Sequence, residues 1–261
     1  MDWPSIEQHV VTGLALVPNQ PHYEDLAGIV YLNRMKAVGG RDAYEHSSAL
    51  LDHAAQGNRF DPFILIHRVD LETTALQQQI VARPSDAASR TADRMIEMDS
   101  NNATVHETVA RLRLAERRPD AALASIRKAE GLRPHYSRYH LVEGDALRLL
   151  GDTTAAIASY REETTLAESE GDWSLAEQRL ILALLETGQY RTAVDEARQT
   201  IVRLRSDAVA HALLGFAHLR LGDLDAAKAA FTAALAIDPT NAPARAGLLE
   251  VGPQNAAVRA R

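Results

Sequence analysis

The chain has 261 residues, of which 46% are hydrophobic and 24% are charged, and its formal net charge at pH 7 is −7. These values allow one or two globular domains or one long repeat array, and the acidic balance argues against a general nucleic-acid-binding protein. Because the chain has no cysteine, a disulfide framework, a thiolate nucleophile and a cysteine-ligated metal site are excluded. It lacks a signal-peptide pattern and an apolar run of about 18 residues, so we expect a soluble, cytoplasmic protein without a membrane anchor.

Four prolines follow helix-like runs, at Pro18, Pro62, Pro134 and Pro239. Proline has no backbone N–H and disfavours helix in the residue before it, so each of these positions predicts a helix end. The spacings between them fit multiples of a unit of about 34 residues with short insertions. The sequence therefore predicts an array of helix-turn-helix units.

The array begins with residues 1–20, where Ile6, Val10 and Gly13 lie before Pro18 as residues of a second helix do. We expect this segment to be a partial unit that has a second helix only. Residues 21–64 predict a complete unit with a longer turn around the sequence AVGGRD.

Further units are predicted at 65–102, 103–136, 137–173 and 174–207. The pattern is weakest in 65–102, which has no clear glycine. After them, residues 242–261 predict a capping helix followed by a frayed tail.

The unit 208–241 carries the most specific pattern. At its fourth, seventh, eighth, eleventh, twentieth, twenty-fourth, twenty-seventh and thirty-second places it holds His211, Leu214, Gly215, His218, Ala227, Phe231, Ala234 and Pro239. The tetratricopeptide repeat family has a large residue, Leu-Gly, an aromatic, Ala, an aromatic, Ala and Pro at these places, in this order. This chain therefore resembles that family. In the unit 103–136, Arg113 departs from the pattern, because the family expects an aromatic residue at the eleventh place.

The resemblance implies an all-α fold, an α-solenoid of about six helix-turn-helix repeats wound as a right-handed superhelix. Each helical pair cannot bury its apolar surfaces alone, and stacking neighbours creates one continuous core. Gly188 and Gly222 stand at the ends of first helices, where glycine accepts the left-handed conformation that closes a helix.

Four histidines raise the question of a metal site. His106, His140 and His211 occupy the same slot of three units, and His218 lies two helical turns after His211. A metal site needs a third ligand that converges on the pair, whereas recurrence with the repeat period indicates packing. We therefore predict packing histidines, with no metal and no cofactor.

Catalytic motifs are also missing. The sequence HETVAR at His106 lacks the second histidine of a zinc-protease helix, and neither a G-x-S-x-G nucleophile elbow nor a phosphate-binding G-x-x-x-x-G-K loop occurs. The adjacent carboxylates Glu162 and Glu163 diverge on a helix. We predict that the chain is not an enzyme.

The resemblance further implies a concave groove lined by the first helices, in which members of the family bind peptides. By position the groove presents Glu107, Arg111, Arg138, Leu141, Asp145, Arg148, Gln178, Arg179, Leu182, Glu186, Phe216, Leu219 and Arg220. Arginines outnumber acids in this set, and arginine can hold a carboxylate by two parallel hydrogen bonds. We expect a mildly basic groove and a partner with an acidic segment. The lysine and asparagine that clamp a chaperone's C-terminal carboxylate in this family are absent from the matching places, so we do not expect that mode of binding.

Three functional hypotheses follow. The leading one is a non-catalytic scaffold that binds a peptide segment of another protein in the groove. The second is the soluble repeat lobe of a larger protein, because the missing first helix leaves the apolar side of residues 5–16 uncapped. In addition, residues 17–28 and 58–71 are similar to the repeat tails that follow the membrane domain of bacterial O-antigen ligase and polymerase-like proteins. The third is a small enzyme whose cofactor site has no sequence signature. The partner and the oligomeric state have no signature either.

Overall fold

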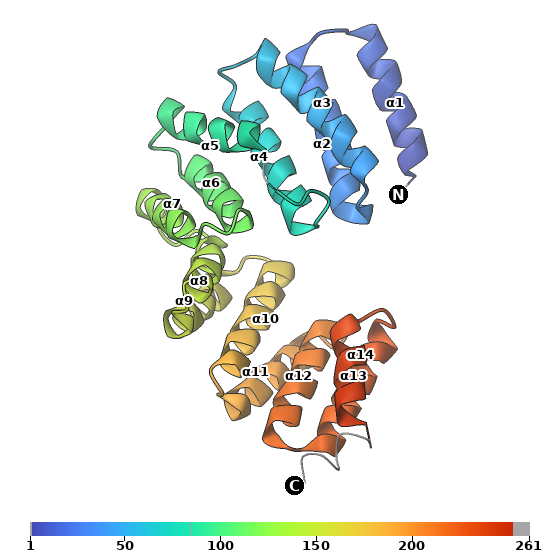
Figure 1. The fold of residues 1–261 in the computed structure, drawn as a ribbon, viewed down its shortest axis with the longest axis vertical. Coiled ribbons are helices and arrows are strands. Elements are labelled where there is room, and N and C mark those ends of the chain that lie inside the picture. The colour runs from blue at the N-terminus through green and yellow to red at the C-terminus, as the bar shows by residue number, and fades with distance from the viewer. Residues whose placement is uncertain (1, 84, 253–261) are drawn as a thin grey trace. The chain divides into compact units, whose positions relative to one another are not determined.

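A computed structural model describes residues 2–83 and 85–252, and within them the chain is all α-helical (Figure 1). It divides into two compact units, Met1–Pro134 and His135–Arg261. The described residues of each unit form seven helices.

The first unit stacks its helices as antiparallel neighbours. Its helices are α1 (Trp3–Leu16), α2 (Pro21–Val38), α3 (Arg41–Gly57), α4 (Pro62–Gln77), α5 (Asp86–Met98), α6 (Ala103–Ala115) and α7 (Pro119–Leu132). Helices α2, α4 and α6 act as first helices, because each packs on the helix that follows it, and α2 also packs on α4 as α4 does on α6. Helix α1 packs on α2.

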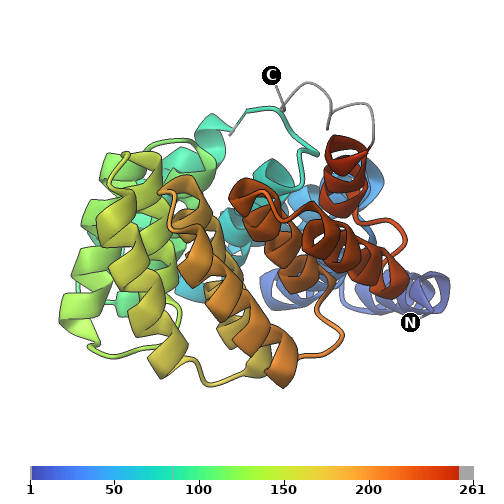
Figure 2. The ribbon, with the colours of Figure 1, turned by 90° about the horizontal axis from the view of Figure 1, so that it is seen from below.

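The second unit repeats this arrangement. Its helices are α8 (Tyr139–Leu149), α9 (Thr153–Leu166), α10 (Glu170–Glu186), α11 (Tyr190–Arg203), α12 (Ala208–Leu221), α13 (Leu224–Ile237) and α14 (Ala242–Val251). Each helix packs on its successor, and α12 also contacts α10 and α14. Figure 2 shows these helices, coloured from green to red, as successive antiparallel neighbours.

Polar caps define where many helices begin. The side chain before the helix accepts a hydrogen bond from a first-turn N–H at Asp2, Asp61, Ser85, Asn102, Asp152, Ser169, Asp207, Asp223 and Asn241. Each such cap stabilises a helix by about 1 kcal/mol, so the start of each of these helices is fixed locally.

Small residues let the helices of a pair approach closely. The alanines at the twentieth place of four units, Ala122, Ala156, Ala193 and Ala227, are fully buried. A Cβ atom added to Gly144 would lie 2.5 Å from the ring of Tyr160, and one added to Gly215 would lie 2.5 Å from the ring of Phe231. The aromatic ring of the second helix therefore rests directly on the backbone of the first.

The predicted turn glycines are confirmed. Gly188 and Gly222 have φ values of 75° and 82°, and Gly151 has 87°. At the matching turn between α6 and α7 the left-handed residue is Arg117, with a φ of 60°.

The prediction that Pro62 follows a helix end is wrong. Helix α3 ends at Gly57, and Pro62 is the first residue of α4, capped by Asp61. Proline suits this position because the first-turn N–H has no partner in the helix and the fixed φ is already helical. Consequently α4 begins three residues before the predicted start of the 65–102 unit.

The fold class predicted from the sequence, an all-α solenoid of helical repeats, is confirmed. The repeat boundaries remain a prediction. Helix α14 packs on α12 and α13, whereas the predicted frayed tail, residues 252–261, lies outside the described residues from 253 on. No helix in the described part of the chain combines the length and apolar character that a membrane span requires.

Candidate functional site

The first helices of the second unit are joined by two ion pairs. Asp145 on α8 lies 3.3 Å from Nε of Arg179 on α10, and Arg148 on α8 donates to Glu186 on α10 at 2.8 Å. All four side chains are partly exposed. We call the surface formed by Asp145, Arg148, Gln178, Arg179, Leu182, Glu186, Phe216 and Arg220 the first-helix face.

Asp145 is also held by a hydrogen bond from the second helix of its own repeat. The hydroxyl of Tyr160, on α9, donates to Asp145 Oδ1 at 2.8 Å. Burial and the neighbouring Asp145 carboxylate hold the pKa of Tyr160 well above its usual range, so the phenol stays a hydrogen-bond donor. The same ring packs on Gly144, which fixes the position of the carboxylate relative to the backbone of α8.

The remaining arginines of the predicted groove also pair with acids of the chain. Arg138 lies 3.9 Å from Asp172, Arg220 lies 3.9 Å from Glu250, and Arg111 of the first unit lies 2.5 Å from Asp70. Each of the five predicted groove arginines therefore has an acidic neighbour within the chain. The excess of arginines over acids in the predicted groove did not indicate this pairing. The first-helix face is a surface of paired charges rather than a free basic surface.

Gln178 and Phe216 are placed by second contacts. The Gln178 amide donates to Ser174 Oγ at 3.1 Å and to Asp207 Oδ2 at 3.0 Å, which links α10 to the N-cap of α12. The half-buried Phe216 ring meets Phe231 edge-to-face with 5.0 Å between the ring centroids. These contacts orient both side chains.

Three predicted groove residues do not present a surface. Glu107 is only 9% exposed, and Leu141 and Leu219 are also buried. Helix α6, which carries Glu107, is packed by α4, α5 and α7 within the first unit, so little of its surface is left. Their burial differs from the prediction that these three residues line the groove.

The first unit has its own row of cross-helix pairs, which the sequence did not reveal. Asp70 on α4 binds both Lys36 of α2 and Arg111 of α6, each at 2.5 Å, and His67 of α4 lies 2.9 Å from Asp25 of α2. Burial opposes ionisation of Asp70, but Arg111 and Lys36 overcome it and hold the pKa of the carboxyl below its usual value. The sequence feature that marks the start of α4, which carries Asp70 and His67, is Asp61-Pro62, a capping residue followed by proline at the first helical position.

A buried polar network joins α3, α4 and the start of α5. Arg68 donates to Asp52 at 2.6 Å and to Glu72 at 3.2 Å, and Glu72 also accepts from Tyr44 and from the backbone N–H of Ser85. Because Arg68 and Glu72 are almost fully buried and their partners belong to the scaffold, this network has a structural role.

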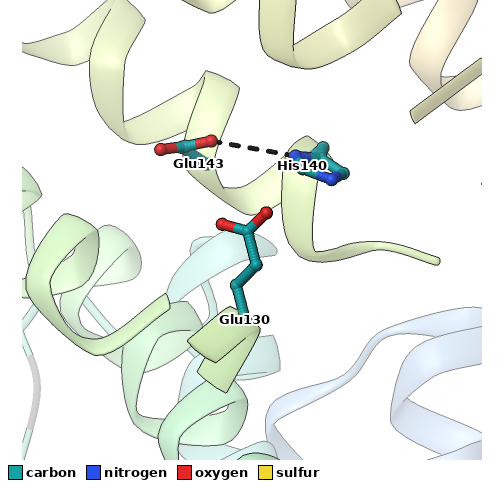
Figure 3. A group of neighbouring side chains, drawn as sticks. All are labelled: Glu130, His140 and Glu143. Atoms are coloured by element: carbon teal, nitrogen blue, oxygen red, sulfur yellow. Dashed lines mark ion pairs between the residues drawn. The ribbon is translucent and has the colours of Figure 1, made fainter. Parts of the chain in front are cut away.

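The four histidines of the repeat pattern are buried or half-buried. His106, His140 and His218 are buried and His211 is half-buried. His106 Nε2 lies 2.9 Å from the Ser100 carbonyl, and His218 Nδ1 lies 3.4 Å from Asp223. His140 Nδ1 lies 3.8 Å from Glu143, one turn further along α8 (Figure 3); Glu130, the third side chain drawn there, is on α7 of the first unit.

Two stretches of the chain match family models for the tetratricopeptide repeat, residues 109–171 and residues 208–241. No curated protein sequence matches the chain.

Solved structures share the fold at low identity. The Cut9–Hcn1 hetero-tetramer of the APC/C has a TM-score of 0.71 at 14% identity over 96% of this chain, which spans 46% of that chain. PilW, a widely conserved type IV pilus biogenesis factor, has a TM-score of 0.69 at 16% identity, covering 87% of this chain and 98% of its own. YrrB, described as a repeat protein with an unusual peptide-binding site, has a TM-score of 0.54 at 17% identity, covering 75% and 96%. At these identities the similarity shows the fold alone.

Proposed function

The chain belongs to the tetratricopeptide repeat family, and from this premise we propose that it is a non-catalytic protein-interaction scaffold whose first-helix face binds a peptide segment of a partner. Proteins of this repeat family generally act as scaffolds for other proteins. A peptide as the ligand is supported by YrrB, a protein of similar fold that has an unusual peptide-binding site.

The observation that carries the proposal is the presence of two partly exposed ion pairs, Asp145–Arg179 and Arg148–Glu186, between α8 and α10. Ion pairs at the surface contribute between about 0 and 1 kcal/mol, and because solvent reaches both of these pairs a ligand can exchange them at little cost. Arg148 and Arg179 can then bind carboxylates of the partner while Asp145 and Glu186 bind its cations.

The proposal includes an acidic segment in the partner, and this segment has to meet one condition. An acidic side chain must displace Glu186 from Arg148, or Asp145 from Arg179, before it binds. Leu182 lies one turn from Arg179 and from Glu186 on α10, and Phe216 lies on α12, which packs on α10; both side chains are half-buried and apolar. A segment that combines an acidic residue with a neighbouring apolar anchor therefore fits the face best.

The test is affinity capture from native lysate with charge-swapped proteins. Arg148→Glu together with Glu186→Arg keeps the intramolecular pair but exchanges the positions of the two charges. A matched control exchanges Arg161 and Glu196, which lie 4.0 Å apart on the second helices α9 and α11. We expect at least one captured protein to be reduced more than fivefold by the first swap and retained by the second.

Equal capture by all three proteins would show that the first-helix face is not used. A protein that is retained by the wild type and the control can next be cut into overlapping peptides, and we expect the binding segment to contain an acidic residue.

A further inference from the structure

A pocket of about 620 Å³ lies in the second unit, where α10, the end of α11 and the start of α12 meet. The polar side chains that matter for its chemistry are Glu170, Ser174, Gln178, Arg203, Arg205 and Asp207. We call it the α10–α12 pocket. Because Gln178 also belongs to the first-helix face, the pocket adjoins that face.

The two arginines of the pocket differ from those of the predicted groove. Among the described residues, the side chains of Arg203 and Arg205 form no ion pair and no hydrogen bond, and both are exposed. The five groove arginines each have an acidic neighbour instead. Arg203 also favours the charge of the buried Glu177, which does not line the pocket. An anionic ligand can therefore bind both arginines without displacing an acid of the chain.

Arg203 is positioned by an aromatic ring. Its guanidinium carbon lies over the Trp173 ring of α10, 4.1 Å from the ring centroid. A guanidinium beside an aromatic face keeps N–H donors at its edge, and these match the two oxygens of a carboxylate. Because the ring already restricts the side chain, less rotational freedom is lost when a ligand binds.

The repeat itself does not require arginine at these two places. Arg203 is the last residue of α11, whereas α13 ends with Ile237. Arg205 stands two residues before the N-cap of α12, and Pro239 stands two residues before the N-cap of α14. Since the matching junction forms with an apolar residue and a proline, Arg203 and Arg205 are available for a role other than folding.

Two acids also line the pocket and limit which ligand fits. Both oxygens of Asp207 already accept hydrogen bonds, Oδ1 from the N–H of Ala210 at 2.9 Å and Oδ2 from Ser174 at 2.7 Å. The Gln178 amide adds a third bond, to Oδ2 at 3.0 Å. Together with the exposed Glu170, this carboxylate repels a second negative charge on the ligand. One carboxylate beside uncharged residues therefore fits better than a run of acids.

We propose that the α10–α12 pocket binds one aspartate or glutamate side chain of a peptide segment, and that Arg203 and Arg205 recognise its carboxylate. The inference rests on the proposed function, because Gln178 connects the pocket to the first-helix face on which that segment lies. It adds a site at which the acidic residue of the segment binds without first displacing Asp145 or Glu186.

The probe is a peptide selected on the full chain from a phage-displayed library of random peptides. The library is first depleted on a variant with Arg203→Gln and Arg205→Gln, two exposed positions at which the fold tolerates glutamine. We expect the enriched peptides to share one aspartate or glutamate. Fluorescence anisotropy of a labelled peptide should show binding at least tenfold weaker when that residue is changed to its amide, and equally weak binding to the double variant.

Two controls locate the binding. Arg191→Gln together with Arg198→Gln changes two exposed arginines of α11 outside the pocket and should leave the affinity unchanged. In the full chain with Trp3→Phe, Trp173 is the remaining tryptophan, and we expect its emission to change saturably with the peptide because it contacts Arg203.

The proposal would be overturned if no peptide were enriched, if the enriched peptides lacked a shared acidic residue, or if the amide peptide bound equally well. Proteins captured in the charge-swap experiment separate this failure from a failure of the proposed function. A captured protein that Arg148→Glu with Glu186→Arg releases, but that Arg203→Gln with Arg205→Gln retains, uses the first-helix face without the pocket.

Discussion

At the scale of single residues, Glu177 is a buried carboxylate on α10, 8% exposed, whose Oε2 has no hydrogen-bond partner. Burial and the neighbouring Glu196 carboxylate raise the pKa of Glu177 from 4.5 to about 7. The folded chain therefore binds this proton more tightly than the unfolded chain. Stability falls as the pH rises from about 4.5 to about 7, and the loss is complete above that range.

The first prediction concerns Glu177→Gln, which removes the ionisation. At pH 8 the substitution should raise the free energy of unfolding by about 1–2 kcal/mol, and near pH 4 it should change it little. Urea denaturation at both pH values measures the difference, and the exposed Glu162→Gln serves as control. An equal gain at both pH values would mean that the ionisation of Glu177 is not the cause.

A second prediction at this scale concerns the contact between Gly215 and the Phe231 ring. In Gly215→Ala the new Cβ meets the ring at 2.5 Å, and overpacking should cost about 1–3 kcal/mol despite the better helix propensity of alanine. The 103–136 unit has Ala110 and Ile126 at the same two places. We therefore expect Phe231→Ile to offset part of the penalty in the double variant.

A double-mutant cycle from urea denaturation tests this coupling, with an expected favourable interaction of about 0.5–2 kcal/mol. Strictly additive penalties would contradict it. The cycle is informative because Gly247 of α14 also approaches the Phe231 ring, so the ring is fixed from two sides.

At the scale of elements, the turn between two helices of a repeat needs one left-handed residue. In the four repeats from α6 to α13, Gly151, Gly188 and Gly222 serve in three turns, and Arg117 with a φ of 60° serves in the turn between α6 and α7. The left-handed conformation costs a non-glycine residue roughly 1 kcal/mol because Cβ approaches the backbone carbonyl.

The third prediction is that Arg117→Gly stabilises the chain by about 0.5–1 kcal/mol, although arginine is exposed and loses its side chain. Thermal unfolding should show a higher midpoint for this variant. The reverse change, Gly222→Ala, should lower it. If both variants moved the midpoint in the same direction, backbone strain would not explain the effect.

At the scale of the whole molecule, each helix contacts only its neighbours in the array, so stability is close to a sum of local terms. Helix α1 has one neighbour and no buried residue, whereas α12 contacts α10, α11, α13 and α14. Local opening should therefore differ strongly along the chain.

The fourth prediction is that amide hydrogen exchange in α1 is at least tenfold faster than in α12, because α1 opens without disturbing the core. Exchange measured by mass spectrometry resolves the two helices. Equal protection would show that α1 unfolds only with the rest of its unit.

The sequence alone determined the helical repeat, because its signals are local. Glycine at 188 and 222 closes first helices, and glycine with an aromatic at 215 and 231 specifies a close helix pair. The start of α4 at Pro62 was not predicted, because proline can follow one helix or begin the next, and only the cap by Asp61 distinguishes the two.

The tertiary structure alone decided the character of the candidate face. Arg148 and Glu186 are 38 residues apart, and Arg111 and Asp70 are 41 apart, so no local pattern joins them. Their pairing depends on how two first helices are rotated against each other, which is set by the packed core between them. For the same reason the burial of Glu107 and the exposure of Tyr23 follow from neighbouring helices, and not from the residue type or its place in the repeat.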